Sequence, residues 1–278
     1  MQKPGTWHGR RSSPVRPARP CRANNNSTRG ESLAATVQKL GGKFSRELGI
    51  SLFSGRAVEI FKWFLASVLF GARISEAIAV RTYREFEREG LLDARQIAAR
   101  GWDGLVAVLD AGGYVRYDFR TATKLLDVCG ALLQNYHGDL NALHAAASDT
   151  ADLEERLKAL GKGIGDVTVN IFLRELRGVW SKAEPLPSDL VLKGAMDLAL
   201  LPRASRDRRI ALALLKERWT AEGNRSQDFP DFEAALLRCG LMLRRRRSRK
   251  ASRSEASQWW QCPHQEFPGS SSSCKLTS

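Results

Sequence analysis

Apolar residues recur along the middle of the chain at the spacing of α-helices. In residues 61–69, and again in residues 125–133, they occupy positions that form one stripe on a helix. The two stripes consist of Phe61, Phe64, Leu65, Val68 and Leu69, and of Leu125, Val128, Cys129, Leu132 and Leu133. The alternating pattern typical of β-strands is nearly absent, so the sequence predicts an all-α fold.

Turn-forming and capping residues divide this pattern into separate helices. Gly90 ends one helix, and Asp93 has the character of an N-cap for the next. Pro185 and Pro187 separate the central helices from a C-terminal group. The predicted helices cover residues 61–70, 74–89, 94–99, 102–109, 121–136, 153–160, 167–176, 189–200, 206–219 and 232–243.

The net charge of +14 comes almost entirely from the two ends of the chain. Residues 1–30 carry seven basic and no acidic side chains, and residues 241–278 carry eight basic and two acidic ones, which leaves +1 for the middle. We expect residues 1–32 and 244–278 to be disordered, because both lack helical periodicity and are rich in polar residues. The charge suggests affinity for polyanions but does not show that the folded part binds nucleic acid.

The positions of cysteine and histidine argue against disulfides and metal centres. Two cysteines lie in apolar helical patterns and three are scattered over the ends, namely Cys129 and Cys239, and Cys21, Cys262 and Cys274. We therefore expect no disulfide framework and a reducing, cytoplasmic compartment. Metal-ligand spacing is lacking at His8, His137, His144 and His264. The longest apolar run, residues 61–70, is too short to cross a membrane, so we expect no membrane partner.

Residues 157–168 have the composition of two helices joined by a glycine-rich hairpin. Gly163 and Gly165 permit positive φ and close backbone approach, and Ile164 between them can anchor the turn in the core. The free N–H groups of the second helix would then face outward and suit one phosphate. A P-loop is excluded because Asp166 stands where Lys-Ser/Thr is needed, and a dinucleotide fingerprint because no strand precedes the glycines. The alternative is an ordinary corner between two helices, closed by glycine caps.

Residues 61–176 resemble, over their whole length, the six-helix core of the endonuclease III family within the helix-hairpin-helix DNA glycosylase superfamily. The segments that carry the resemblance are Phe64 to Glu76, Gly112 to Tyr114, Thr121 to Leu126 and Leu160 to Val169. The resemblance implies two helical lobes, residues 57–178 and residues 33–56 plus 179–243, with a cleft between them beside the hairpin. It also implies that double-stranded DNA and a monovalent cation bind there. The implied hairpin contacts are Lys162, Gly163, Ile164, Gly165, Asp166 and Thr168.

The chemical step is also placed by resemblance. Leu186 to Lys193 resembles the catalytic loop of the alkylpurine-glycosylase branch, where an aspartate, here Asp189, stabilises the cationic sugar of the transition state. The alternative role of Asp189 is a helix N-cap without chemistry. Members that nick the strand carry a lysine where this chain has Val167, and Lys162 is expected to face DNA backbone, so we expect no lyase activity. Weaker candidates for the carboxylate are Asp166 and Glu184.

Two loops of this family insert side chains into DNA. Here Arg73 would fill the gap left by the flipped base, and Tyr114 or Tyr117 would wedge the duplex or stack on a base. A surface ion pair for Arg73 and core packing for the tyrosines are the alternatives. Trp63 and Trp102 lie in apolar stripes and are expected in the core. The cysteines are too few and too widely spaced for the iron–sulfur cluster of many members, so we expect no cofactor besides the cation.

Together these observations predict a monomeric, cytoplasmic DNA base-excision-repair glycosylase, nucleoid-associated if the source is bacterial. It would be monofunctional and would hydrolyse the base–sugar bond of a damaged or mispaired, flipped-out nucleotide. Two alternatives stay open. A non-catalytic DNA-binding protein with this scaffold could keep Asp189 buried as a cap, whereas the enzyme needs Asp189 in a solvent-open cleft. A helical protein-interaction module would lack a basic surface around Gly163.

Overall fold

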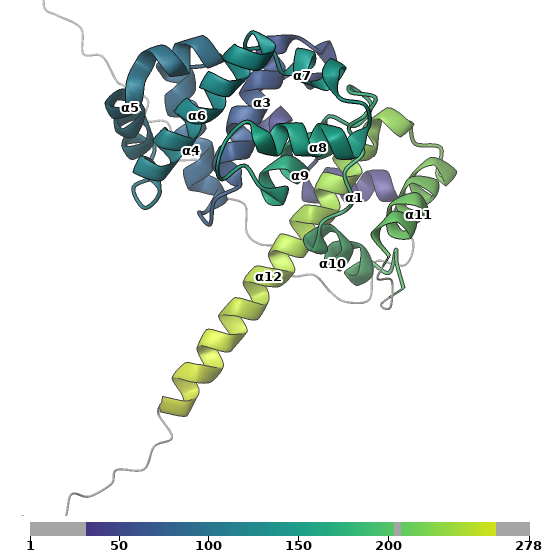
Figure 1. The fold of residues 1–278 in the computed structure, drawn as a ribbon. Coiled ribbons are helices and arrows are strands. Elements are labelled where there is room, and N and C mark those ends of the chain that lie inside the picture. The colour runs from purple at the N-terminus through teal and green to yellow at the C-terminus, as the bar shows by residue number, and fades with distance from the viewer. Residues whose placement is uncertain (1–31, 203–206, 260–278) are drawn as a thin grey trace, which may run out of the picture. The chain divides into compact units, whose positions relative to one another are not determined.

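The computed structural model describes residues 32–202 and 207–259. These residues contain no β-strand, and the predicted all-α class is confirmed (Figure 1). The helices are α1 (Leu33–Leu40), α2 (Phe44–Glu47), η1 (Leu52–Ser54), α3 (Ala57–Phe70), α4 (Glu76–Arg88), α5 (Ala94–Ala111), α6 (Asp118–Tyr136), α7 (Leu140–Ala146), α8 (Thr150–Ala159), α9 (Asp166–Glu175), α10 (Asp189–Asp197), α11 (Arg208–Ala221), η2 (Ser226–Asp228) and α12 (Phe229–Trp259).

Helix α3 is buried on nearly every side because its sequence is apolar around most of its circumference. Every residue from Trp63 to Leu69 is buried, and the helix contacts α4, α7 and α9. The indole Nε1 of Trp63 donates a hydrogen bond to the carbonyl oxygen of Phe172 in α9, at 3.0 Å. Helix α9 is therefore fixed to the centre of the fold.

Helices α5 and α6 pack along each other. Gly101, with φ +71°, interrupts α5 and separates the two helices that the sequence predicts at residues 94–99 and 102–109. Asp93 and Gln96 form a capping box at the start of α5. Cys129 of α6 is buried as predicted, and burial raises the pKa of its thiol to about 12. This cysteine is a core residue.

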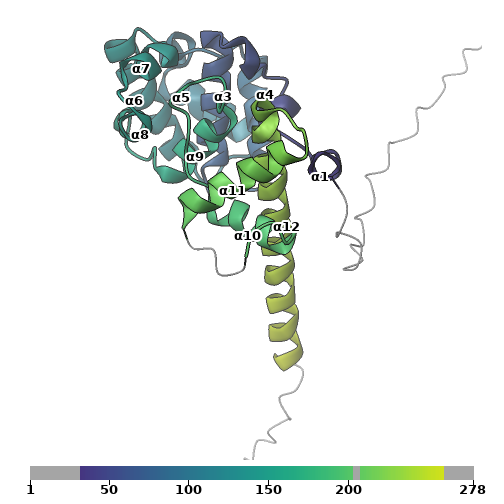
Figure 2. The same cartoon turned by 90° about the vertical axis from the view of Figure 1, so that its right-hand side faces the viewer.

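Helices α10 and α12 cross closely at two glycines (Figure 2). A Cβ on Gly194 would overlap the carbonyl oxygen of Leu236, and one on Gly240 would overlap that of Leu190. Helix α1 also packs against α12, so the first and last described helices are neighbours. The described helices belong to one compact unit, and their division into two lobes stays a prediction.

Buried charged side chains join the N-terminal segment, the end of α9 and α12. The carboxylate of Glu175 accepts hydrogen bonds from the backbone amides of Phe44 and Ser45, at 2.9 and 3.0 Å. Arg177 donates to Glu233 of α12 at 2.8 Å. Removing one partner of a buried pair leaves an uncompensated charge, which costs about 3–5 kcal/mol. These bonds therefore hold α9 firmly between the two ends of the described chain.

Helix α12 is longer than the sequence predicts. The predicted helix ends at residue 243, whereas α12 continues to Trp259, so the disorder expected for residues 244–259 is wrong. This segment contains no Pro or Gly, and its Arg, Lys, Ala, Gln and Glu residues all favour helices. Ser32, expected in the N-terminal end, caps α1. The described residues do not include 1–31 and 260–278. The disorder expected for these segments, and the three cysteines in them, therefore lie outside the described residues.

Candidate nucleic-acid interface

A tight turn, residues 160–165, joins α8 to α9. Gly163 has φ +94°, a conformation that favours glycine. Ile164 is buried and anchors the turn in the core, so only its backbone can meet a ligand. Gly165 has φ −119° and forms the N-cap of α9. Of the two hairpin glycines, Gly163 is therefore the one that uses a positive φ.

The first turn of α9 presents backbone N–H groups that no side chain caps. The carboxylate of Asp166, the first residue of α9, pairs with Lys158 at 2.8 Å instead of capping the helix. Uncapped N–H groups with the helix dipole behind them attract an anion. Lys162 is exposed on the same turn. The geometry thus suits the phosphate contact expected at Lys162, Gly163 and Gly165.

A lysine from α6 brings positive charge to this turn. A Cβ on Gly163 would stand 2.9 Å from Cε of Lys124 and 3.4 Å from its Nζ. Burial of the Lys124 side chain, and to a lesser extent the charge of Arg120, lowers the pKa of Lys124 below the usual lysine value. Sequence patterns give no sign of this contact, because Lys124 and Gly163 lie on separate helical segments that meet only in the folded chain.

The turn between α3 and α4 lies against the start of α9. A Cβ on Gly71, which ends α3, would overlap Oγ1 of Thr168. Thr168 is buried in this contact, so its side chain packs in the fold, and a DNA contact at this residue through its backbone stays a prediction. The side chain is buried because the second helix of the hairpin packs directly on α3. Arg73, two residues after Gly71, is exposed on the α3–α4 turn.

The turn between α5 and α6 presents different residues from those expected. Tyr114 is fully buried and donates a hydrogen bond to the carbonyl oxygen of Leu69 at 2.8 Å, so its predicted DNA contact is wrong. Tyr117 is half-buried, with its ring packed at an angle of 65° to that of Tyr114. The exposed apolar side chains here are Val115 and Phe119, which are 63% and 59% exposed.

Trp102 extends this exposed apolar surface. It is 39% exposed, so the predicted core position is wrong, whereas Trp63 is buried as predicted. Its ring centroid lies 5.2 Å from that of Phe119, and its Nε1 donates to Oγ1 of Thr123 at 3.1 Å. Trp102 lies directly after the break at Gly101, and the buried side chains that follow it on α5 are Leu105, Val108 and Leu109.

Five basic side chains around these turns form no ion pair with an acid in the described part of the chain. They are Arg73, Arg116, Arg120, Lys124 and Lys162. By contrast, Arg84 on α4 pairs with Glu87 at 2.6 Å. Cations without an acidic partner are available to the phosphates of a ligand. We use the name hairpin face for a set of residues on these turns, namely Arg73, Val115, Arg116, Phe119, Arg120, Lys124 and residues 162–165. The α3–α4 and α5–α6 turns, which carry part of this set, lie at the lower edge of the core in Figure 1.

Two carboxylates flank the α5–α6 turn and offset part of this charge. Asp118 is buried and accepts a hydrogen bond from the amide of Phe119 at 2.7 Å. Desolvation and a hydrogen bond with Asp118 raise the pKa of Asp110. The five basic residues outnumber these two acids, and the exposed Asp166 beside the turn pairs with Lys158, so the hairpin face is basic.

Asp189 begins α10 without capping it. Ser188 is the N-cap, and its Oγ accepts a hydrogen bond from the amide of Val191 at 3.4 Å. The alternative role of Asp189 as the cap is therefore wrong. The Asp189 side chain is 71% exposed, and its Oδ1 pairs with Arg208 at 2.6 Å. The carboxylate is open to solvent, with its other oxygen free of that ion pair.

A hydrogen bond fixes the loop before Asp189 to the helix that follows the hairpin. The side-chain Nδ2 of Asn170 in α9 donates to the carbonyl oxygen of Leu186 at 2.8 Å. Helix α9 thus presents uncapped N–H groups at its start and holds the loop of Asp189 along its length. Val167, at the start of the same helix, is 64% exposed.

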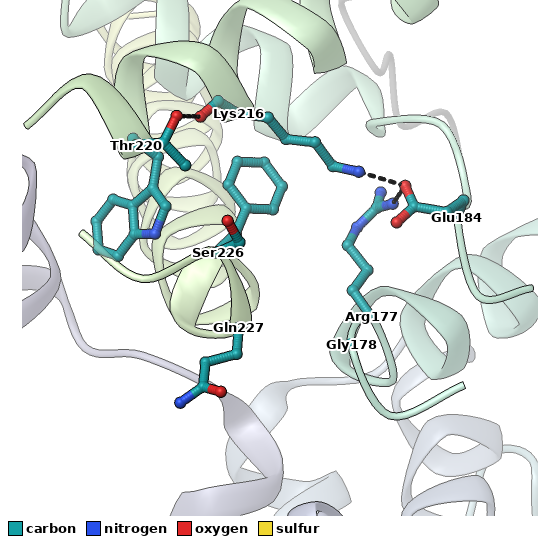
Figure 3. Close-up of a pocket in the computed structure, with 9 residues that line it drawn as sticks. Arg177, Gly178, Glu184, Lys216, Thr220, Ser226 and Gln227 are labelled. Carbon is teal, nitrogen blue, oxygen red and sulfur yellow. Dashed lines mark hydrogen bonds and ion pairs between the residues drawn. The ribbon is translucent and has the colours of Figure 1, made fainter. Parts of the chain in front are cut away.

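A cavity of about 360 Å³ lies beside α11, η2 and the start of α12 (Figure 3). Arg177 and Lys216 both pair with Glu184 on its wall, at 2.8 and 2.6 Å. Two cations on one carboxylate make Glu184 a poor candidate for stabilising a further positive charge. The rings of Trp219 and Phe229 also line the cavity, and none of the hairpin-face residues does.

No protein-family model, curated protein or solved structure matches the chain. Among the described residues, no helix combines the length and apolar character needed to span a bilayer. The same residues contain no group of three or more His, Cys, Asp or Glu side chains placed to hold a metal ion. The case for a function therefore rests on the hairpin face and on Asp189.

Proposed function

We propose that this protein is a monofunctional DNA glycosylase that binds double-stranded DNA through the hairpin face. One observation carries the proposal: at the α8–α9 turn, an uncapped helix start, a glycine with positive φ and the cations of Lys124 and Lys162 lie together. A phosphate contact uses all three features: the helix start supplies hydrogen-bond donors, the glycine allows close approach of the backbone, and the basic side chains supply positive charge. A protein-interaction module has no need of a basic surface around Gly163, which disfavours that alternative.

In this proposal the hairpin turn grips one phosphate while neighbouring side chains enter the duplex. Lys124 and Lys162 add charge at the phosphate. Val115 and Phe119, which are exposed and apolar, take the wedge role first considered for the tyrosines. Inserting an apolar side chain between bases costs about a few kcal/mol per base step, which contacts to the bent duplex offset. Arg73, on the adjacent turn, would fill the space left by the flipped base.

Asp189 is the group proposed for the chemical step. Its carboxylate would stabilise the positive charge that develops on the sugar as the bond from C1′ to the base nitrogen breaks. The oxygen of a water molecule then bonds to C1′, and a water proton ends on the departing base. The products are a free base and an intact strand with an abasic sugar. Arg208 holds one carboxylate oxygen, which leaves the other for the sugar or the water.

Val167 supports hydrolysis rather than strand nicking. It is exposed at the start of α9, where nicking members of the resembled family carry lysine. A valine has no amine with which to form a Schiff base on the sugar. The proposed enzyme therefore depends on water as the nucleophile.

The second candidate is a non-catalytic DNA-binding protein, and the ion pair between Asp189 and Arg208 favours it. If that pair persists when DNA is bound, the carboxylate serves to hold α10 to α11 rather than to face a sugar. The hairpin face would serve this protein equally well, because phosphate contacts position a duplex without any chemistry.

The deciding experiment incubates the protein with a panel of duplexes, each carrying one damaged or mispaired base. Abasic sites are revealed by strand cleavage in alkali. The glycosylase proposal expects at least one substrate that is cleaved only after alkali. Asp189→Asn should abolish most turnover on it while leaving duplex binding intact.

Asp197→Asn is the matched control, because Asp197 ends the helix that Asp189 begins. Turnover should survive in this control. Duplex binding without base release from any member of the panel would favour the non-catalytic candidate. Full turnover in Asp189→Asn would show that another group carries the chemistry.

A further inference from the structure

The second half of α12 extends beyond the buried part of the fold. Its first turns are buried at Phe232, Leu236 and Cys239, where the helix packs against its neighbours. From Arg244 to Ser248 every side chain is exposed. Figures 1 and 2 both show this half of the helix running past α10 with no described helix beside it. We call residues 244–259 the α12 extension.

The root of the extension is tied to the turn that carries Arg73. Arg245 and Arg238 of α12 pair with the two carboxylate oxygens of Glu76, at 3.4 and 3.7 Å. Glu76 is the first residue of α4, directly after the α3–α4 turn. The extension therefore leaves the fold next to one edge of the hairpin face.

The charge of the extension surrounds the helix instead of forming a stripe. Arg244, Arg245, Arg246 and Arg247 are consecutive, and at about 100° per residue they point to all sides. Arg249, Lys250 and Arg253 follow in the sequence, with Glu255 as the one acid before Trp259. The exposed arginine run lacks the apolar stripe of a coiled coil or of a membrane-surface helix. Its charge is complementary to a polyanion.

We propose that the α12 extension is a second duplex-binding element, which contacts the DNA backbone beside the segment held by the hairpin face. This inference rests on the proposed DNA interface. The extension is about 24 Å long at 1.5 Å per residue. Because a duplex rises about 3.4 Å per base pair, the extension would add roughly seven base pairs to one side of the footprint. It reads no sequence, since its partners are phosphates.

The expected contribution follows from counterion release. Each phosphate contact changes the slope of log affinity against log salt by about 0.9, or roughly eight-fold in affinity at 0.1 M salt. Because the four arginines point to all sides and Arg245 pairs with Glu76, about two of them can face a duplex. Their removal should lower affinity for a long duplex by roughly sixty-fold and reduce the salt slope by about 2.

The test measures anisotropy of labelled, undamaged duplexes of about 12 and about 24 base pairs over a range of salt concentrations. The variant changes Arg244→Gln, Arg245→Gln, Arg246→Gln and Arg247→Gln together, which keeps helix-favouring side chains. Wild-type protein should bind the longer duplex more tightly than the shorter one. The gain in affinity should exceed the statistical gain that comes from the larger number of binding positions on the longer duplex. The variant should lose this length-dependent gain and about 2 units of salt slope.

A matched control removes the same number of charges elsewhere. It changes Arg84→Gln, Arg88→Gln, Arg100→Gln and Arg156→Gln, four arginines that pair with acids of their own. An equal loss in this control would show that net charge alone is responsible and would overturn the inference. Wild-type affinity and salt slope in the extension variant would also overturn it, as would preferred binding of an RNA duplex or of phosphatidylserine vesicles.

Base release separates this inference from the proposed function. In the extension variant, single-turnover base release from a short lesion duplex at saturating protein should match wild type, since the extension lies outside the chemistry. If the wild-type protein shows length-dependent DNA binding that the variant loses, but releases no base, the DNA-binding role of the extension is upheld and the glycosylase proposal is refuted. Base release with no effect of the variant on binding would do the reverse.

Discussion

Replacing Gly163 with alanine tests the hairpin turn most directly. At φ +94° an L-residue is strained by roughly 1–2 kcal/mol, so the variant should lose about that much free energy of unfolding. For a chain of this size the loss corresponds to a fall in Tm of about 2–8 °C. The new Cβ would also stand 2.9 Å from Cε of Lys124, so the flexible lysine must move away from the turn.

Displacing Lys124 removes one cation from the proposed phosphate site. Affinity for DNA should then fall by roughly eight-fold at 0.1 M salt, the value of one phosphate contact. The fall should be the same for every duplex, damaged or not, because a phosphate contact carries no sequence information.

Gly165→Ala is the matched control on the same turn. Gly165 has extended backbone, and a Cβ there would meet nothing within 4 Å. Alanine is a poorer N-cap than glycine, so some stability should be lost, about 0.5–1 kcal/mol. The lysine contact with Gly163 is untouched, and DNA affinity should stay closer to wild type than in Gly163→Ala.

Thermal denaturation followed by circular dichroism and anisotropy titrations on several undamaged duplexes provide the measurements. The stability loss and the affinity loss are separate quantities, so affinity is compared well below the Tm of the variant. If folded Gly163→Ala binds every duplex with wild-type affinity, the turn is an ordinary corner between two helices and does not hold a phosphate.

Other perturbations separate the remaining roles. Phe119→Ala should slow single-turnover base release more than it weakens binding to undamaged DNA; equal effects would argue against a wedge. Lys124 pairs with phosphate only when it is protonated, and its pKa is lowered, so DNA affinity should fall with rising pH before an ordinary lysine would lose its proton. The variant Lys124→Arg stays charged, so this fall should be missing from its pH profile. Borohydride should trap no covalent protein–DNA complex. If a complex were trapped with the wild-type protein but not with Lys124→Arg, a Schiff base at Lys124 would be shown and the monofunctional mechanism refuted. A chain ended after Leu243 should still unfold cooperatively, because the side chains of Arg244 to Ser248 are exposed; a non-cooperative transition would show that the extension supports the fold.

Most of the longer helices, with several of their caps and breaks, could be predicted from the sequence alone, whereas α1, α2 and α7 fall outside the predicted ranges. Asp93 and Gln96 cap α5, and Gly101 divides it, because these signals act over a few residues of backbone. The positive φ at Gly163 is of the same kind. The all-α class follows as well, since helical periodicity without strand alternation leaves helix packing as the way to bury the apolar stripes. What the chain does with its helical surfaces is not local in this sense.

Only the tertiary structure decided which side chains of the turns meet solvent. Tyr114 and Phe119 lie close together in the sequence, yet the hydroxyl of Tyr114 reaches the end of α3 while Phe119 is left outside. Lys124 and Gly163 likewise meet because α6 and the α8–α9 turn pack together. A hydrophobic stripe specifies that one face of a helix is buried, but the partner that covers it, and the residues at its edges that stay exposed, depend on contacts between segments far apart in the chain.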